Sequence, residues 1–200
     1  MNTIAVETLQ TAAPVQRHSL GSSNRSAREI ARLFSDGSGD TSPKYQRGSI
    51  WSDGQRRLLV KSWLSGVPVP AIIINDRLFG PWPDGEDGLP AGGFLYAAID
   101  GKQRIETAIA WFSGDLAVPA SWFPAEVIEV TEDTNDGPYV RHTGLILPEQ
   151  RHQGVSFHLP TVEAKVATIQ EEAALYLLVN GAGTAQTVED LLNAEGVVNS

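Results

Sequence analysis

The clearest hydrophobic pattern lies in the middle of the chain. Phe94–Ile99 is a continuous apolar run, and apolar positions at helical spacing follow it. These positions are Ile105, Ala108, Ile109 and Phe112. Asp100-Gly101, a pair typical of tight turns, separates the two patterns. The segment therefore predicts a strand, a tight turn and a helix that ends near Gly114.

Two earlier segments carry helix signals. Residues 24–35 have an apolar face, and either Asn24 or Ser26 can cap the helix that this face predicts. A second helix is expected to begin after Ser52 and to stop at Gly66, because polar capping residues precede an apolar stripe there.

Strand signals are shorter. The β-branched run Ala71–Ile74 predicts a buried strand, and the alternating run Ala125–Val130 predicts another. The stretch 131–157 is ambiguous, with short strands expected at Tyr139-Val140 and Leu145–Leu147. Asp136-Gly137 is the turn signal within it.

The last forty residues are predicted to be helical. Apolar residues at helical spacing end at Asn180-Gly181, and a capping-box pattern at Thr187 predicts a final short helix. The residues of the first apolar face are Val162, Val166, Ile169, Ala173 and Leu177.

These elements do not alternate as regular βαβ units, so they favour an α+β fold with a small sheet and flanking helices. The Gly- and Pro-rich segment Gly80–Gly93 is expected to be a surface loop that joins two paired strands. With 200 residues, 42% of them hydrophobic, the chain fits one domain over 25–200 after a flexible arm over 1–24.

Composition narrows the setting. The chain has no cysteine, which excludes disulfides and thiolate metal sites. No apolar run approaches the ~20 residues of a membrane span, and the first residues lack the pattern of a signal peptide. We therefore expect a cytoplasmic protein without a membrane partner.

Charge is unevenly distributed. The net charge of −9 argues against a protein that coats nucleic acid without sequence preference. Five cations nevertheless gather within eighteen residues, which suits a localised anionic ligand and leaves DNA contact open. They are Lys44, Arg47, Arg56, Arg57 and Lys61.

The predicted turn also carries candidate chemistry. Lys102 and Arg104 fall in the first turn of the helix, where cations are unfavourable unless an anion lies beside them. Asp100 has two compatible interpretations: it caps the helix, or it is a carboxylate that holds a metal ion or orients a water molecule. Gln46 and Arg47 precede the second helix start, where Gln55 and Arg56 lie. Two helix N-termini with Gln and Arg can therefore face one ligand.

Other chemistry has no support in the sequence. The histidines His18, His142, His152 and His158 show no zinc-binding spacing. The chain has no Gly-x-x-x-x-Gly-Lys-Ser/Thr phosphate loop and no Gly-x-Ser-x-Gly elbow.

Several short motifs occur in an order typical of one family. They are Tyr45-Gln46-Arg47, Trp51, Gln55-Arg56-Arg57, Gly66–Pro70, Ile99–Arg104 and Asn180–Thr184. With these motifs, over roughly residues 25–195, the chain resembles the N-terminal domain of GmrSD-type restriction proteins. That family, within the ParB/sulfiredoxin superfamily, has a Tyr-Gln-Arg box and an Asp-Gly-Gln-Gln-Arg motif.

The resemblance implies a compact ParB/sulfiredoxin-like domain that binds nucleotide phosphates. The phosphate turn would consist of Asp100, Gly101, Gln103 and Arg104. The opposing wall would consist of Tyr45, Gln46, Arg47 and Gln55, with Arg56 beside it. A third edge would consist of Asn180, Gly183 and Thr184.

Two residues depart from the family pattern. Lys102 stands where the family usually has Gln, which adds a charge to the phosphate turn. Ala182 replaces the first Gly of the usual pair, which changes how closely the backbone can approach a ligand. We also expect no room for the nuclease module that larger relatives carry.

The leading functional expectation is a nucleotide-binding domain that hydrolyses nucleoside triphosphates in a phage or bacterial DNA-related system. Asp100, Gln103 and Arg104 would be catalytic, and Asp100 would bind Mg²⁺ as cofactor. The partners would be a nucleoside triphosphate, DNA, and a separate nuclease or other effector protein. The alternatives are a non-catalytic module that grips DNA or a partner protein, and a DNA nuclease or phosphotransferase.

Overall fold

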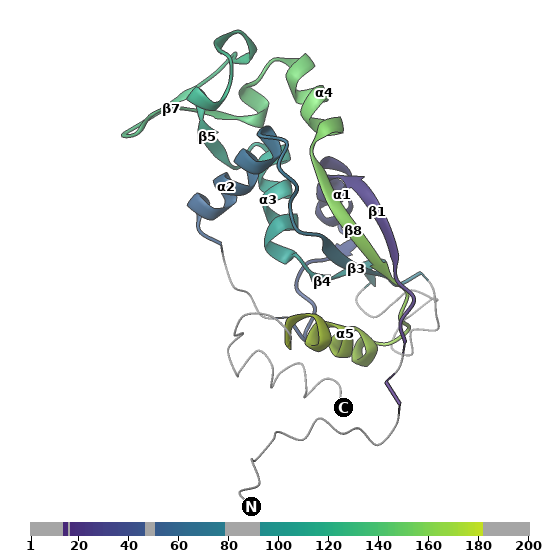
Figure 1. Ribbon diagram of the computed structural model, residues 1–200. Helices are drawn as coiled ribbons and strands as arrows, with labels where there is room; N and C mark the ends of the chain where they lie inside the picture. Colours follow the sequence, from purple (N-terminus) through teal and green to yellow (C-terminus); the bar gives the residue numbers. More distant parts are fainter. Residues whose placement is uncertain (1–13, 16, 47–50, 79–92, 182–200) are drawn as a thin grey trace, which may run out of the picture.

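The computed structural model describes residues 14–15, 17–46, 51–78 and 93–181 (Figure 1). Within them, the larger sheet has five strands in the order β1-β8-β3-β4-β2. These are β1 (Gly21–Ser26), β2 (Gly39–Asp40), β3 (Ile72–Asp76), β4 (Tyr96–Asp100) and β8 (His158–Ala164). Strand β3 pairs antiparallel with β4 and parallel with β8, so the sheet is mixed. With the helices around it, the chain is an α+β domain, as predicted.

Five α-helices belong to the described part of the chain. They are α1 (Ala27–Ser35), α2 (Asp53–Leu64), α3 (Lys102–Ser113), α4 (Leu147–Ser156) and α5 (Ile169–Gly181). Ser26 caps α1 by accepting from the Glu29 amide, so the second of the two predicted caps is the one used. Ser52 and Gln55 form a capping box on α2, and Gly66 follows its end at φ 66°. The Ser26 cap, the helix start after Ser52 and the stop at Gly66 are therefore confirmed, whereas residues 24–26 belong to β1 and not to the first helix.

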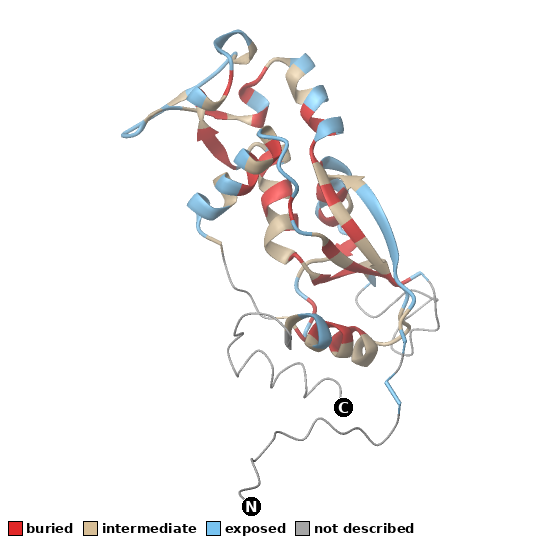
Figure 2. Cartoon of the chain, viewed as in Figure 1, coloured by how far each residue is buried: buried red, intermediate tan, exposed pale blue. Residues whose placement is uncertain are grey.

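The main hydrophobic cluster lies between the larger sheet and the packed helices α1 and α3. Ile30 of α1, Ile72 and Ile74 of β3, and Trp111 of α3 are fully buried in it. Figure 2 shows the buried residues concentrated along α3 and the inner strands, whereas the edge strand β1 is largely exposed. This cluster fixes α3 against the sheet.

A smaller sheet lies at the opposite end of the molecule from α5, beside α4 (Figure 1). Its strands β5 (Ala117–Pro119), β7 (Gly137–Arg141) and β6 (Glu132–Thr134) pair in that order. Three short 3-10 helices flank them: η2 (Ala120–Trp122), η3 (Ala125–Val127) and η4 (His142–Gly144). The predicted Asp136-Gly137 turn joins β6 to β7, with Gly137 at φ 105°.

Helix α5 builds a second buried cluster on the other face of the larger sheet. Successive side chains of a strand point to opposite faces. Ile72 and Ile74 accordingly belong to the main cluster, while Ile73 packs against the second one. The second cluster combines α5 residues with Ile99, the residue before the Asp100 turn, and with Tyr45.

The strand predicted at Ala125–Val130 is wrong. Pro124 precedes a 3-10 turn at its start, and the rest makes a single bridge, between Ile128 and Leu145. Val130 is 65% exposed, so the alternation does not line a buried face. The strand predicted at Leu145–Leu147 is also wrong, since Leu147 opens α4, whereas Tyr139-Val140 does lie in a strand.

The helical prediction for the last forty residues is wrong at its start. His158–Ala164, which includes Val162, is strand β8 and pairs with β1 and β3 on its two sides. Apolar residues four apart suit a strand as well as a helix, and pairing on both sides decides for the strand. The helical face from Ile169 to Leu177 is confirmed in α5. The helix expected from Thr187 lies outside the described residues.

Residues 21–24, assigned by composition to the N-terminal arm, belong to β1. They are exposed and polar, so they carry no hydrophobic pattern, and backbone pairing with β8 places them in the sheet. The loop Gly80–Gly93 lies almost wholly outside the described residues, but the strands it joins, β3 and β4, are paired as predicted.

Candidate functional site

The Asp100 turn is built by the junction of β4 and α3. Gly101 adopts φ 91°, a left-handed conformation that L-residues rarely adopt. A Cβ at Gly101 would lie 2.9 Å from the Ile72 Cβ atom, so the position is also crowded. Gly101 is the N-cap of α3, and no side chain caps the helix, so Asp100 does not cap it. The α3 N-terminus therefore keeps its favourable potential for an anion.

Arg104 reaches back across the turn. Its Nη2 atom donates to the Asp100 carboxylate at 2.8 Å and to the Ala71 carbonyl at 3.0 Å. Its buried Nε atom has no hydrogen-bond partner among the described residues. Arg104 is thus held in place by one end of its guanidinium group and keeps a free donor at the other.

The segment before α2 lies against the turn. Lys102 donates from Nζ to the Ser42 hydroxyl at 2.7 Å, and its Nζ is 3.9 Å from Glu106. Gln46 donates from Nε2 to the Ile99 carbonyl at 3.4 Å, immediately before Asp100. The Gln46 Oε1 atom is buried and has no partner in the described part of the chain. The predicted proximity of Gln46 to the turn is therefore present.

The N-terminal ends of α2 and α3 also lie together. The Trp51 amide donates to the Gln103 side chain at 2.9 Å, and Arg56 lies 4.0 Å from Glu106 of α3. Gln55 is exposed and uses its side chain to cap α2. The N-termini of α2 and α3 thus lie close together, as expected, and Gln103 links them. Gln55, however, caps its own helix.

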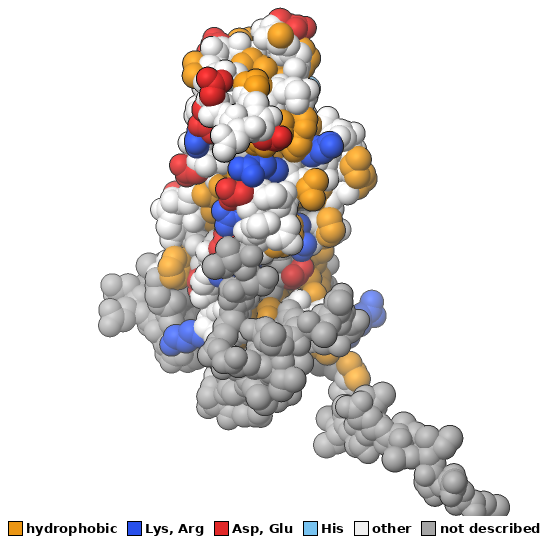
Figure 3. Space-filling model, turned by 90° about the vertical axis from the view of Figure 1, so that its left-hand side faces the viewer, with side chains coloured by type: hydrophobic (Ala, Val, Ile, Leu, Met, Phe, Trp, Pro, Cys, Tyr) orange, Lys and Arg blue, Asp and Glu red, His pale blue; other side chains and the backbone are white. Residues whose placement is uncertain are grey.

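Most cations of the predicted basic cluster that the structure describes have protein partners. Arg57 donates to the Ala117 carbonyl at 2.9 Å and lies over the Tyr139 ring. Lys61 lies over the Trp122 ring. Figure 3 shows Lys and Arg side chains interspersed with Asp and Glu on this face rather than forming a continuous basic surface. Arg56 of this cluster therefore lies near α3, whereas Arg57 and Lys61 lie near the smaller sheet.

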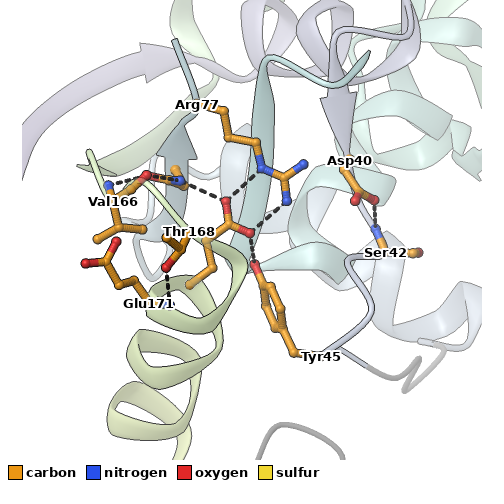
Figure 4. A network of polar contacts seen from close by, with 9 residues as sticks. Asp40, Ser42, Tyr45, Arg77, Val166, Thr168 and Glu171 are labelled. Atoms are coloured by element: carbon orange, nitrogen blue, oxygen red, sulfur yellow. Dashed lines mark hydrogen bonds and ion pairs between the residues drawn. The ribbon is translucent and has the colours of Figure 1, made fainter. Parts of the chain in front are cut away.

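A buried polar network that the sequence did not predict joins α5, the end of β3 and Tyr45 (Figure 4). The Glu172 carboxylate of α5 accepts two hydrogen bonds from Arg77 at 2.7 Å each. It also accepts one from Asn75 at 2.8 Å and one from the Tyr45 hydroxyl at 3.2 Å. Figure 4 shows Arg77 and Tyr45 converging from opposite sides. The Tyr45 side chain is thus buried in this network.

Electrostatics keep Tyr45 neutral and Arg77 charged in this network. Burial and then the Glu172 charge raise the pKa of Tyr45 well above its ordinary value, so the hydroxyl stays a donor. Burial alone would lower the pKa of Arg77, but the hydrogen bonds and charge of Glu172 raise it. Arg77 therefore stays charged.

The third predicted edge is only partly described. Asn180 donates from its side chain to the Tyr176 carbonyl one turn earlier in α5. Arg47, Gly183 and Thr184 lie outside the described residues. The structure thus brings together the turn, Lys102, Gln46 and the start of α2. The roles of all the predicted site residues in nucleotide binding stay predictions.

Asp100 can contribute one carboxylate to a magnesium ion. Among the described residues, no group of three or more His, Asp and Glu side chains is arranged to hold a metal. Mg²⁺ is commonly bound by one or two carboxylates together with substrate phosphates. Asp100 also accepts a hydrogen bond from Arg104 through Oδ2, so a magnesium ion at this turn stays a prediction.

The fold and this turn define a class of protein: an α+β domain with an uncapped, cation-flanked helix N-terminus as a candidate anion site. A model of the family described as "GmrSD restriction endonuclease, N-terminal domain" matches residues 30–173. The match covers well over half of the chain, and the protein belongs to this family. Membership makes the chain a DNA-related module of the restriction and defence class.

Two further comparisons add nothing to this assignment: no curated protein and no solved structure matched the chain. Within the part of the chain that the structure describes, no helix combines the length and apolar character needed to cross a bilayer.

Proposed function

We propose that the chain is a nucleotide-binding module with nucleoside triphosphatase activity, acting in a restriction or defence system. The observation that carries the proposal is the α3 N-terminus. Gly101 leaves it without a side-chain cap, and its first turn has no acidic residue. Lys102 and Arg104 occupy that turn instead, an arrangement that an anion would stabilise.

Two buried atoms at the turn that have no partner among the described residues support a ligand there. Buried polar groups are usually hydrogen-bonded, so those that lack a partner need an explanation. The Arg104 Nε donor suits a phosphate oxygen. The Gln46 Oε1 acceptor suits a hydroxyl or a water molecule of a bound nucleotide.

The residues of the turn then divide the work. Lys102 and Arg104 neutralise charge that develops on the transferred phosphoryl group, which is the main catalytic contribution in such reactions. Asp100 orients the attacking water, whose oxygen bonds to the γ-phosphorus as the bond to the β-phosphate oxygen breaks. The products are a nucleoside diphosphate and inorganic phosphate. Mg²⁺, when bound, would neutralise phosphate charge beside Asp100.

The test is nucleotide binding by the full chain. Each of ATP, GTP, CTP and UTP, with Mg²⁺, is added in a thermal-shift series, and at least one is expected to raise the melting temperature. Lys102→Ala should abolish most of the shift. Lys61→Ala, which also removes one helical lysine but one that lies over Trp122, should keep it.

A phosphate-release assay on the same proteins separates binding from hydrolysis. Release that Asp100→Asn lowers strongly would support the catalytic role of Asp100. Binding without release would identify a non-catalytic nucleotide sensor. If none of the four nucleotides shifts the melting temperature, the proposal is wrong.

A further inference from the structure

The Glu172 carboxylate is unusual because it is charged, fully buried and completely satisfied. A carboxylate offers about four acceptor sites, and Arg77, Asn75 and Tyr45 supply four hydrogen bonds. Arg77 is itself only 3% exposed. Removing Arg77 would leave an uncompensated buried charge, and removing Asn75 or Tyr45 would leave a buried acceptor without its hydrogen bond. The network therefore favours a single arrangement of the elements that it joins.

Those elements meet under the candidate phosphate turn. Glu172 lies in α5, and Arg77 directly follows β3. Tyr45 belongs to the segment whose next residue, Gln46, bonds the Ile99 carbonyl. Ile99 and Tyr45 also share the second buried cluster. Any displacement of the Tyr45 ring would therefore be transmitted to Gln46 and to the strand end that carries Asp100.

We propose that Glu172, paired with Arg77, is a positioning residue for the nucleotide site, and that it acts through the Tyr45 hydroxyl. The inference rests on the proposed function. Glu172 and Tyr45 are both fully buried. They would therefore act on the site through their neighbours and not by contact with the nucleotide. The hydrogen bond to Glu172 fixes the position of the Tyr45 ring. The position of that ring in turn determines how the next residue, Gln46, is placed against the turn.

The hydrogen bond to Glu172 fixes the position of the Tyr45 ring more tightly than apolar packing in the second cluster does. Tyr45 contacts Tyr176 at a ring-centroid distance of 5.6 Å with the planes tilted by 48°. Such ring contacts tolerate small slides, because several aromatic geometries are close in energy. A hydrogen bond weakens steeply when its angle or length departs from the optimum. The Tyr45 hydroxyl is therefore the element that fixes the register of the wall against the turn.

The experiment compares Tyr45→Phe with Tyr139→Phe in the full chain. Each variant loses one phenolic hydroxyl, and Tyr139 bonds the exposed Asp136 in the β6–β7 hairpin. Affinity for the nucleotide that binds the wild type is titrated calorimetrically with Mg²⁺ present. The titration is done at a temperature where melting curves show every protein folded. We expect Tyr45→Phe to raise the Kd about tenfold, the scale of one hydrogen bond, and Tyr139→Phe to leave it unchanged.

A second variant keeps the inference testable if Tyr45→Phe does not fold. Glu172→Asp retains the charge that neutralises Arg77 but withdraws the carboxylate by one methylene from Tyr45. It is expected to weaken binding in the same direction. A purely structural role would lower the melting temperature of these variants and leave the Kd of the folded protein at the wild-type value.

Different results would overturn the positioning role and the proposed function. If the wild type binds a nucleotide and both network variants bind it equally well, the positioning role is overturned and the proposed function stands. If the wild type binds none of the four nucleotides, the proposed function fails and the inference fails with it. Weakened binding in a folded network variant, with Tyr139→Phe normal, supports both.

Discussion

The two buried clusters of this protein hold the chain in different ways. The main cluster is almost wholly apolar, and Ile30, Ile72 and Trp111 pack there with few polar contacts. The second cluster is linked to the buried ion pair between Glu172 and Arg77, because its residue Tyr45 bonds Glu172. Apolar packing supplies stability with little directionality, whereas a buried network adds geometric demands and little net stability.

Helix α3 connects the main cluster to the second cluster. Its body is anchored in the main cluster through Trp111, whose indole N–H donates to Gln153 at 3.1 Å. Its N-terminus emerges from Ile99 and Asp100, above the second cluster. Stability and site geometry are thus assigned to opposite ends of one helix, and this division can be tested.

The largest effect is expected from breaking the buried ion pair. Glu172→Ala removes the carboxylate that accepts two hydrogen bonds from the buried Arg77, and we expect a loss of about 3–5 kcal/mol in the free energy of unfolding. Urea denaturation measures it. Glu132→Ala, which removes the 2.9 Å surface partner of Arg141, should cost about 0–1 kcal/mol. Equal losses in the two variants would contradict the assigned role of burial.

An apolar replacement of the pair sharpens the comparison. Arg77→Met with Glu172→Leu removes both charges together, and such replacements are often neutral or stabilising. We expect urea denaturation to show that the double variant regains most of the stability lost in Glu172→Ala. The double variant should still bind the nucleotide more weakly than the wild type, because the Tyr45 hydroxyl has lost the Glu172 carboxylate as its acceptor. Recovery of both properties would show that the network has no geometric role.

The converse variant lies in the main cluster. Ile30→Ala opens a cavity in a fully buried position of α1, and we expect it to cost about 2–5 kcal/mol. The nucleotide Kd of the folded protein should stay at the wild-type value, because Ile30 belongs to the main cluster and not to the second one, which contains Tyr45 and Ile99. Denaturation and calorimetric titration of one preparation measure both quantities. A large change in Kd would indicate that the clusters are not separable.

The same division explains what the sequence could predict. The strand, turn and helix around Asp100 follow from local signals, namely an apolar run, an Asp-Gly pair and helical spacing. Their bounds in the structure agree closely. Strands β1 and β8 were missed because pairing with distant segments, not local pattern, makes them strands.

The proximity of residues at the candidate site was predictable from motifs, but the long-range contacts beside it were not. Gln46 does meet the turn, as the family motifs implied. The Glu172–Arg77 pair joins residues 95 positions apart, which no local pattern reports. One signal was present: Glu172 occupies the apolar face of α5 between Ile169, Ala173 and Tyr176. A carboxylate at such a position predicts a buried partner.

A smaller effect is expected at the turn glycine. Gly101 and Gly66 both have positive φ, 91° and 66°, but a Cβ at Gly66 would meet nothing within 4 Å. Gly66→Ala should therefore cost only the left-handed conformation, about 1–2 kcal/mol. Gly101→Ala adds overlap with Ile72, so we expect roughly 1 kcal/mol more. It should also weaken nucleotide binding, which Gly66→Ala should not; equal effects would argue against a crowded turn.

The smallest effect concerns pH and the far end of α3. His142 is only 3% exposed and packs edge-on against Trp111 and Phe112. Burial lowers its pKa below the ordinary 6.5. The unfolded chain therefore takes up a proton first as the pH falls, so stability present above pH 6.5 is lost progressively below it. Urea denaturation between pH 8 and 5 should show this decline, and His142→Phe should make it shallower while leaving nucleotide affinity unchanged, because the residue belongs to the stabilising end of the helix.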